Sequence, residues 1–162
     1  MVRGLSESVC FKNPPYGKKT GRNLYVAGPS KVNRNTTLGD NVRFHGMKIT
    51  GKGRVDIGSY VIAAGDCMII TQNHNYEGDA IPYDDTLNFR DVVIGDFVWI
   101  GARVLILPGT KIGEGAIIQG GAVVHGEIPP YAIAGGNPAK VFKYRDAEHF
   151  KKLKAEGKFY RG

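Results

Sequence analysis

Large aliphatic residues recur at every sixth position over the C-terminal half of the chain. From Ile94 onward the sequence divides into the units IGDFVW, IGARVL, ILPGTK, IGEGAI, IQGGAV and VHGEIP. The first position is always isoleucine or valine, and the fifth positions are Val98, Val104, Thr110, Ala116, Ala122 and Ile128. A period of six matches neither an α-helix nor simple strand alternation. It predicts short strands joined by tight turns, coiled into a stack with about 4.8 Å between coils.

The period continues less regularly toward the N-terminus. The units IGSYVI, AAGDCM and IITQNH begin at Ile57, Ala63 and Ile69, and LGDNVR begins at Leu38. A one-residue slip near 44–51 breaks the register there. We therefore expect a parallel β-helix over 36–142, preceded by an irregular segment over 1–35 that holds Pro14-Pro15 and shows little periodicity.

The pattern is interrupted once and ends before the C-terminus. Between His74 and Val92 the polar segment NYEGDAIPYDDTLNFRD predicts a loop over 75–91 that leaves the coil, and long loops in compact domains are usually functional. After the coil, Phe150 and Leu153 lie three residues apart and Asp146 can cap a helix. The segment 143–162 is therefore expected to hold a short amphipathic helix over about 146–156, in an otherwise all-β chain.

Charge and composition narrow the classes of partner. The net charge of +7 comes from the two ends: residues 1–35 carry +6 and residues 143–162 carry +4, whereas 36–142 carry −3. This distribution favours an anionic ligand or partner, including peripheral contact with an anionic surface. No zinc finger, RNP-like motif or recognition helix is present, so nucleic acid is not expected as a partner. No apolar run is long enough to cross a bilayer, no secretory signal is recognisable, and two cysteines make no disulfide framework, so the expected location is cytoplasmic.

His74 is the first candidate for a general base. It lies in TQNHNY, where the coil ends and the loop begins. Imidazole is the side chain best suited to remove a hydroxyl proton near neutral pH. The alternative is a surface histidine in a turn. Of the other histidines, His45 could form a wall of an acceptor pocket, while His125 and His149 are expected to be structural or solvated. No histidine–carboxylate spacing predicts a metal site.

The segment IGDFVWIGARVLILPGTKIGEGAIIQGGAVVHGEIPPYAIAGGNPAKVFK resembles the C-terminal half of the hexapeptide-repeat acetyltransferases. That group includes maltose and galactoside, polysaccharide and streptogramin acetyltransferases. The resemblance is strong over 57–145 and weak over 36–56. It implies a left-handed β-helix, a homotrimer with active sites between adjacent subunits, and acetyl-CoA as co-substrate. The implied activity is acetyl transfer to a hydroxyl on a sugar.

The resemblance also assigns roles to residues. His74 matches the family's catalytic histidine, and the backbone N–H of Ala102, after Gly101, matches the donor to the oxyanion. The positions that match coenzyme A contacts are Gly101, Ala102 and Gly120 at the pantetheine arm, Lys140 and Lys143 at the phosphates, and Lys111 as a weaker candidate. The chain departs from the pattern at His125-Gly126, where relatives often carry a Thr-Lys pair, so one expected cation is missing.

The loop offers polar and aromatic side chains for the acceptor: Asn75, Tyr76, Glu77, Asp79, Tyr83, Asp84 and Asp85. The alternative is a solvated loop whose polarity has no specific meaning. Trp99 either forms the edge of the active site or packs at a coil corner or subunit interface. The helical N-terminal segment of maltose-type relatives is absent, which favours a sugar unit of a polysaccharide or its precursor as acceptor.

Three other functions stay open at this point. One is N-acetylation of an amino sugar, and another is acetylation of an antibiotic. The third is a structural β-helix trimer without catalysis. A carbonic-anhydrase-like site would need three histidine ligands for zinc, and three cannot be placed here.

Overall fold

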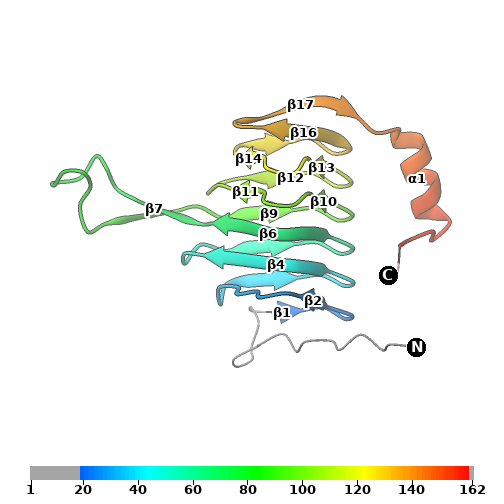
Figure 1. Ribbon diagram of the computed structural model, residues 1–162, viewed down its shortest axis with the longest axis horizontal. Coiled ribbons are helices and arrows are strands. Elements are labelled where there is room, and N and C mark those ends of the chain that lie inside the picture. The colour runs from blue at the N-terminus through cyan, green and yellow to red at the C-terminus, as the bar shows by residue number, and fades with distance from the viewer. Residues whose placement is uncertain (1–18, 161–162) are drawn as a thin grey trace.

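The computed structural model describes residues 19–160 and shows a stack of parallel coils (Figure 1). Ile94 pairs with Ile112, eighteen residues later, so three hexapeptide units complete one coil. One sheet, sheet A, consists of β1 (Lys19–Thr20), β3 (Thr36–Leu38), β5 (Val55–Ile57), β9 (Val92–Ile94), β12 (Lys111–Ile112) and β15 (Glu127–Ile128). The predicted parallel β-helix is confirmed.

Sheet B wraps around the other two sides of the stack. Its strands are β2 (Tyr25–Ala27), β4 (Arg43–Thr50), β6 (Ile62–Ile70), β10 (Trp99–Ile100), β11 (Leu105–Ile106), β13 (Ile117–Ile118), β14 (Val123–Val124), β16 (Ala132–Gly136) and β17 (Ala139–Tyr144). The first halves of β4 and β6 pair with β2 and β10, and the second half of β6 pairs with β11. Strand β17 is antiparallel to β16 and closes the last coil.

The stack therefore has three faces and three corners. Face A is sheet A. Face B holds β2, β10, β13 and β16, together with the first halves of β4 and β6. Face C holds β11 and β14, together with the second halves of β4 and β6. We call the edge between faces B and C the Ala102 corner. The edge between C and A, which carries the loop, is the hairpin corner, and the edge between A and B is the helix corner.

The repeat positions form the core. The first residues of the six units, from Ile94 to Val124, are all buried, and so are the fifth residues. Thr110 is buried without an unsatisfied hydroxyl, because its Oγ1 donates to the carbonyls of Leu107 at 2.7 Å and Val124 at 3.1 Å. The turns repeat a left-handed residue at the same period: Phe97, Arg103, Gly109, Gly115 and Gly121 all have positive φ.

Three expectations outside the regular repeat can be compared with the structure. The segment 1–35 was expected to be irregular, but from Lys19 onward it adds β1 and β2 to the stack, and its first 18 residues lie outside the described part. The register slip near 44–51 is a bulge between Phe44 and His45 in the β4–β6 pairing. The helix is confirmed as α1 (Ala147–Ala155), with Asp146 accepting a hydrogen bond from the His149 N–H at its start.

The predicted loop is partly a hairpin. Strands β7 (Gln72–His74) and β8 (Leu87–Phe89) pair antiparallel and project from the hairpin corner, on the side of the stack opposite α1 (Figure 1). Bonds between their backbones hold the base of the excursion, so only its tip is a loop in the ordinary sense.

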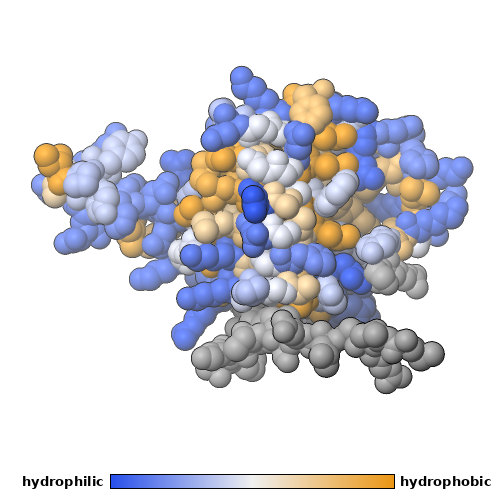
Figure 2. Space-filling view, in the orientation of Figure 1, coloured by the Kyte–Doolittle hydropathy of each residue, from blue (hydrophilic) through white to orange (hydrophobic). Residues whose placement is uncertain are grey.

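The outward side chains differ between the faces. On face A the outward ladder is polar apart from one residue: Thr37, Asp56, Val93, Lys111 and Glu127. On faces B and C the outward ladders are largely apolar from β6 onward: Ile62, Trp99, Ile117 and Ile133 on B, and Met68, Leu105 and Val123 on C. One coil earlier the same ladders carry Arg43 on B and Lys48 on C. Figure 2 shows hydrophobic patches on either side of a paler column on the side of the stack turned to the viewer.

Candidate active site

The Ala102 corner is a column of closely stacked backbone turns. Gly101 N–H donates to the Ile118 carbonyl and Gly121 N–H to the Ala102 carbonyl, both at 2.8 Å. A Cβ placed on Gly101 would overlap the backbone nitrogen of Gly120, so glycine is required by the close approach of successive coils. The corner geometry is therefore fixed by backbone packing.

Two backbone donors at this corner point away from the fold's own acceptors. Within residues 19–160 no group accepts a hydrogen bond from the N–H of Ala102 or of Gly120, and both residues are exposed. A Cβ on Gly120 would lie 3.1 Å from the Ala102 carbonyl oxygen, so the two turns are in contact. Rigid N–H groups without an internal acceptor can stabilise negative charge on a bound ligand.

Cys67 supports this corner from inside, although it is not among the predicted site residues. Its buried Sγ donates to the Gly101 carbonyl at 3.2 Å and to the Ala64 carbonyl at 3.3 Å. Burial raises the pKa of the Cys67 thiol, which keeps it protonated as a donor. Its fifth place in the unit AAGDCM was the available signal, because fifth positions point inward.

His74 is the last residue of β7 and lies outside the coil. Its ring stacks on Tyr83 with 3.9 Å between centroids and 19° between planes, and both residues are exposed. Its backbone pairs with Leu87 of β8. The hairpin thus sets the position of His74, and Tyr83 sets the plane of its ring.

Two of the loop residues that were predicted to bind the acceptor form hydrogen bonds within the loop. The Asn75 side-chain oxygen accepts from the Glu77 N–H at 3.2 Å. The Asp84 carboxylate accepts from the Asp79 N–H at 3.2 Å and from the hydroxyl and N–H of Thr86. These bonds, the Thr86 hydroxyl first, lower the pKa of Asp84. The side chains of Tyr76, Glu77, Tyr83 and Asp85 are exposed along the loop.

A single chain keeps His74 and Ala102 apart. Gly65 accepts from the Arg103 N–H at 2.8 Å and so lies at the Ala102 corner. From there β6 crosses face C to Ile70, roughly 16 Å away at about 3.3 Å per residue, and β7 then leaves the stack. The two residues therefore lie at opposite edges of face C, and the chain by itself does not bring the imidazole to the Ala102 N–H.

Two other predicted acceptor residues lie nearer to that corner. His45 pairs with Gly65 and is therefore two coils from Ala102, about 10 Å along the stack. Its ring is exposed and lies 5.7 Å from the Tyr25 ring. Trp99 is 55% exposed on face B, three residues before Ala102.

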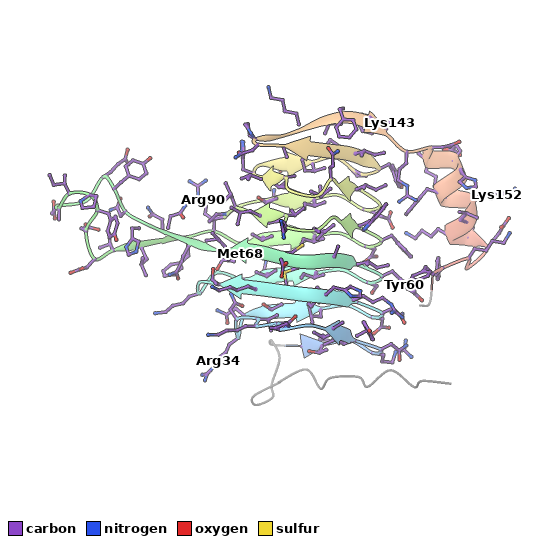
Figure 3. All side chains as sticks on the ribbon, in the orientation of Figure 1. Arg34, Tyr60, Met68, Arg90, Lys143 and Lys152 are labelled. Atoms are coloured by element: carbon purple, nitrogen blue, oxygen red, sulfur yellow. The ribbon has the colours of Figure 1, made fainter. Side chains whose placement is uncertain are left out.

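The predicted phosphate-binding lysines fall in two places. Lys140 on β17 pairs with Gly135, which follows the Gly120 turn in the next coil, and Lys143 lies further along the same strand at the end of the stack (Figure 3). Both are exposed. Lys111 instead lies on face A, where its Nζ pairs with Glu127 at 3.0 Å. The structure thus brings Lys140 toward the Ala102 corner and does not bring Lys111 there.

The described residues contain no group of three or more histidine, cysteine or acidic side chains that could hold a metal ion. In the same part of the chain, no helix has the length and apolar character needed to cross a membrane.

Comparison with known proteins places the chain in a family. Residues 91–126 match the model of the bacterial transferase hexapeptide (six repeats). A chloramphenicol acetyltransferase of Morganella morganii is 43% identical over 158 residues, covering 87% of this chain and 72% of the relative. A putative lipopolysaccharide biosynthesis O-acetyl transferase of Escherichia coli K12 is 36% identical over 113 residues, covering 64% of this chain and 58% of the relative.

Among solved structures, a galactoside acetyltransferase in complex with coenzyme A superposes with a TM-score of 0.71 at 26% identity, covering 83% of this chain and 68% of that one. The chain spans a varying share of its curated relatives, down to 31% of a probable acetyltransferase of Mycobacterium tuberculosis. The coil stack and these matches agree. The chain therefore belongs to the hexapeptide-repeat acetyltransferase family.

Proposed function

We propose that the chain transfers the acetyl group of acetyl-CoA to a hydroxyl on a sugar, with His74 as general base and the Ala102 N–H as oxyanion donor. The observation that carries this proposal is the pair of exposed N–H groups at Ala102 and Gly120, which no described residue accepts. A turn with two N–H groups that no described residue accepts suits a substrate whose carbonyl oxygen becomes negatively charged during the reaction.

The chemistry follows from these groups. His74 accepts the proton of the acceptor hydroxyl while the hydroxyl oxygen forms a bond to the thioester carbonyl carbon. The Ala102 N–H donates to the carbonyl oxygen as its negative charge grows. When the carbon–sulfur bond breaks, His74 returns its proton to the departing thiolate. An acetyl ester and free coenzyme A result.

The residues around the corner fit coenzyme A. Gly120 leaves room for the pantetheine arm because it has no side chain, and its N–H can bond an amide carbonyl there. Lys140 and Lys143 lie beyond it along the stack and can pair with the phosphates. Lys111 is left out of this proposal because it is paired with Glu127 on another face.

A homotrimer would complete the site. His74 and Ala102 lie at opposite edges of face C, so a second copy is needed to supply one of them. The apolar outward ladders of faces B and C suit burial between subunits, and a polar face A suits solvent. Ile81, 96% exposed at the hairpin tip, can reach such a neighbour. We propose a cytoplasmic enzyme of polysaccharide biosynthesis.

A second acceptor class is favoured by one comparison. The Morganella relative, at 43% identity, is named for chloramphenicol, a drug acceptor rather than a sugar. The loop residues Tyr76 and Tyr83 would suit an aromatic drug as well as a sugar ring.

An acceptor panel separates the two. We expect thiol release from acetyl-CoA with sugars or sugar-containing glycans, and little with chloramphenicol or with an amino sugar that offers only its amine. His74→Ala should lower the rate of transfer by about a hundredfold or more. His149→Ala, which changes an exposed histidine on α1, should not lower it. Transfer to chloramphenicol alone would establish acetylation of the drug as the activity. Undiminished transfer by a folded His74→Ala protein would refute the mechanism.

A further inference from the structure

The Ala102 corner holds a column of turn residues one position after Ala102 and its counterparts in the other coils. Successive members of the column lie on adjacent turns, and all of them have positive φ: Gly28, Gly46, Asp66, Arg103 and Gly121. Glycine adopts this conformation without steric cost, and three of the five are glycine. The exceptions, Asp66 and Arg103, place exposed side chains on a corner that otherwise has none at this position.

Asp66 and Arg103 lie beside the Ala102 N–H. Arg103 directly follows Ala102, and its own N–H donates to the Gly65 carbonyl at 2.8 Å. Asp66 therefore lies one coil from Arg103, about 4.8 Å along the stack toward the N-terminal end. Its carboxylate leans over the next turn in that direction, since a Cβ placed on Gly46 would lie 3.6 Å from the Asp66 Oδ1. The acid and the base thus extend from neighbouring turns at the place of the proposed transfer.

The fold does not use either charged group. Within residues 19–160, no hydrogen bond or ion pair joins the Asp66 carboxylate or the Arg103 guanidinium to another residue. The two groups do not pair with each other, although they occupy equivalent positions in adjacent coils. On face A, by contrast, Lys111 and Glu127 also lie in adjacent coils and pair at 3.0 Å. The corner therefore presents an acceptor and a donor that are both available to a ligand.

Coenzyme A and the acceptor need opposite directions along this corner. In the proposed function, coenzyme A extends from Ala102 over Gly120 toward Lys140, at the C-terminal end of the stack. A hydroxyl that attacks the same thioester must come from a side that the coenzyme does not occupy. The direction left along the corner leads over Asp66 to His45, which pairs with Gly65. This is the side on which the unused carboxylate lies.

The two groups together favour a neutral ligand that is rich in hydroxyls. A carboxylate can only accept hydrogen bonds and a guanidinium can only donate them, whereas a hydroxyl does both. A sugar ring can therefore bind Asp66 and Arg103 at once through hydroxyls on neighbouring carbons. A ligand with a net charge would be repelled by one of the two groups. Hydrogen bonds to charged groups are also stronger than those between neutral groups.

We propose that Asp66 and Arg103 bind the acceptor sugar beside Ala102. Asp66 accepts a hydrogen bond from a hydroxyl next to the one that is acetylated, and Arg103 donates to another oxygen of the same ring. This inference rests on the proposed function, because it takes the Ala102 corner as the place of transfer. It names the two side chains that select an acceptor with neighbouring hydroxyls.

Substitution by glycine tests the assignment and keeps the turn, because glycine occupies the same place in other coils. Asp66→Gly should raise the KM for the acceptor about tenfold or more and leave the KM for acetyl-CoA unchanged. Arg103→Gly should act in the same direction. Asn41→Gly is the matched control, since Asn41 is a polar residue with positive φ at the helix corner, and it should change neither KM. An unchanged acceptor KM in Asp66→Gly, or a rise in the KM for acetyl-CoA instead, would overturn the proposal.

Monodeoxy acceptors test the same contact from the side of the ligand. The sugar that is acetylated is used as its methyl glycoside, together with the derivatives that each lack one hydroxyl. One derivative should raise the KM of the unsubstituted protein about tenfold, and the same derivative should cost Asp66→Gly less than about twofold, because its partner is already gone. Equal penalties for every derivative in the two proteins would overturn the proposal.

The same measurements separate this inference from the proposed function. Transfer to a sugar with a KM that Asp66→Gly does not change would refute the inference and leave the function intact. Transfer to chloramphenicol alone would refute the sugar acceptor. In that case a KM for the drug that Asp66→Gly raises would support the binding of the acceptor at Asp66, and an unchanged KM would overturn it.

Discussion

The Ala102 corner and the β7–β8 hairpin supply the two halves of the proposed chemistry in opposite ways. At the corner the working groups are backbone N–H groups, fixed by glycines that let successive coils touch. On the hairpin the working group is an imidazole, exposed and held by ring stacking and by bonds local to the loop. The Ala102 corner is part of the hexapeptide repeat, whereas the β7–β8 hairpin is an insertion into it.

The difference has a mechanical consequence. A change at the corner disturbs the coil stack and the chemistry together, because the same backbone atoms serve both. A change on the hairpin can remove chemistry and leave the stack intact, because the coil bonds on either side of the insertion do not depend on it. Activity and stability should therefore be coupled in one region and separable in the other.

The largest expected effect is loss of the base on the hairpin. His74→Ala should lower kcat by about 10² to 10⁴, the usual contribution of a general base, with no change in the thermal midpoint of unfolding. His74→Gln keeps a polar side chain of similar reach and should be equally inactive. Thiol release and calorimetry on the same samples measure both quantities. A fall in Tm that accompanies the loss of activity would contradict the expectation that activity and stability are separable on the hairpin.

At the corner, Gly101→Ala should lower stability and activity together. The added methyl overlaps the Gly120 backbone, and overpacking of this kind costs about 1–3 kcal/mol. Gly65→Ala is the matched control on the same corner, because its Cβ would meet only the His45 carbonyl oxygen, at 3.4 Å, and its φ is not in the left-handed region. Denaturant unfolding of both variants tests this, and equal stabilities would show that the corner is not closely packed.

The sequence predicted the coil better than the site, for a physical reason. Burial imposes a period, so the inward residues from Ile94 to Val124 could be identified without coordinates. Hydrogen bonds outside the repeat impose no period. Asp84 accepts from Thr86, two residues further on, within an aperiodic loop. The bond from Cys67 to Gly101 and the pairing of β2 with β4 join residues far apart in the sequence. The pairing of Lys111 with Glu127 could not be predicted for the same reason, because it follows from coil closure.

A smaller effect should come from loosening the hairpin without touching His74. Asp84→Asn weakens three hydrogen bonds to Asp79 and Thr86, and should raise the acceptor KM severalfold with kcat and Tm little changed. The adjacent Asp85→Asn is the control. Because these bonds lower the pKa of Asp84, the ordered loop should persist above the ordinary carboxyl range and be lost as pH falls through the lowered pKa. Amide exchange at Thr86 reports this, and pH-independent protection would contradict it.

The smallest effect concerns the end of the stack, where the corner meets solvent. Lys140→Gln removes one exposed cation, and a screened charge on a phosphate should change the KM for acetyl-CoA by only about two- to threefold at moderate salt. Lys111→Gln removes an equal charge from face A and should leave that KM unchanged. Because attraction between exposed charges is screened, the Lys140 effect should shrink at high salt. A larger effect at Lys111 than at Lys140 would place coenzyme A on face A, and the backbone donors at Ala102 would then lose their assigned partner.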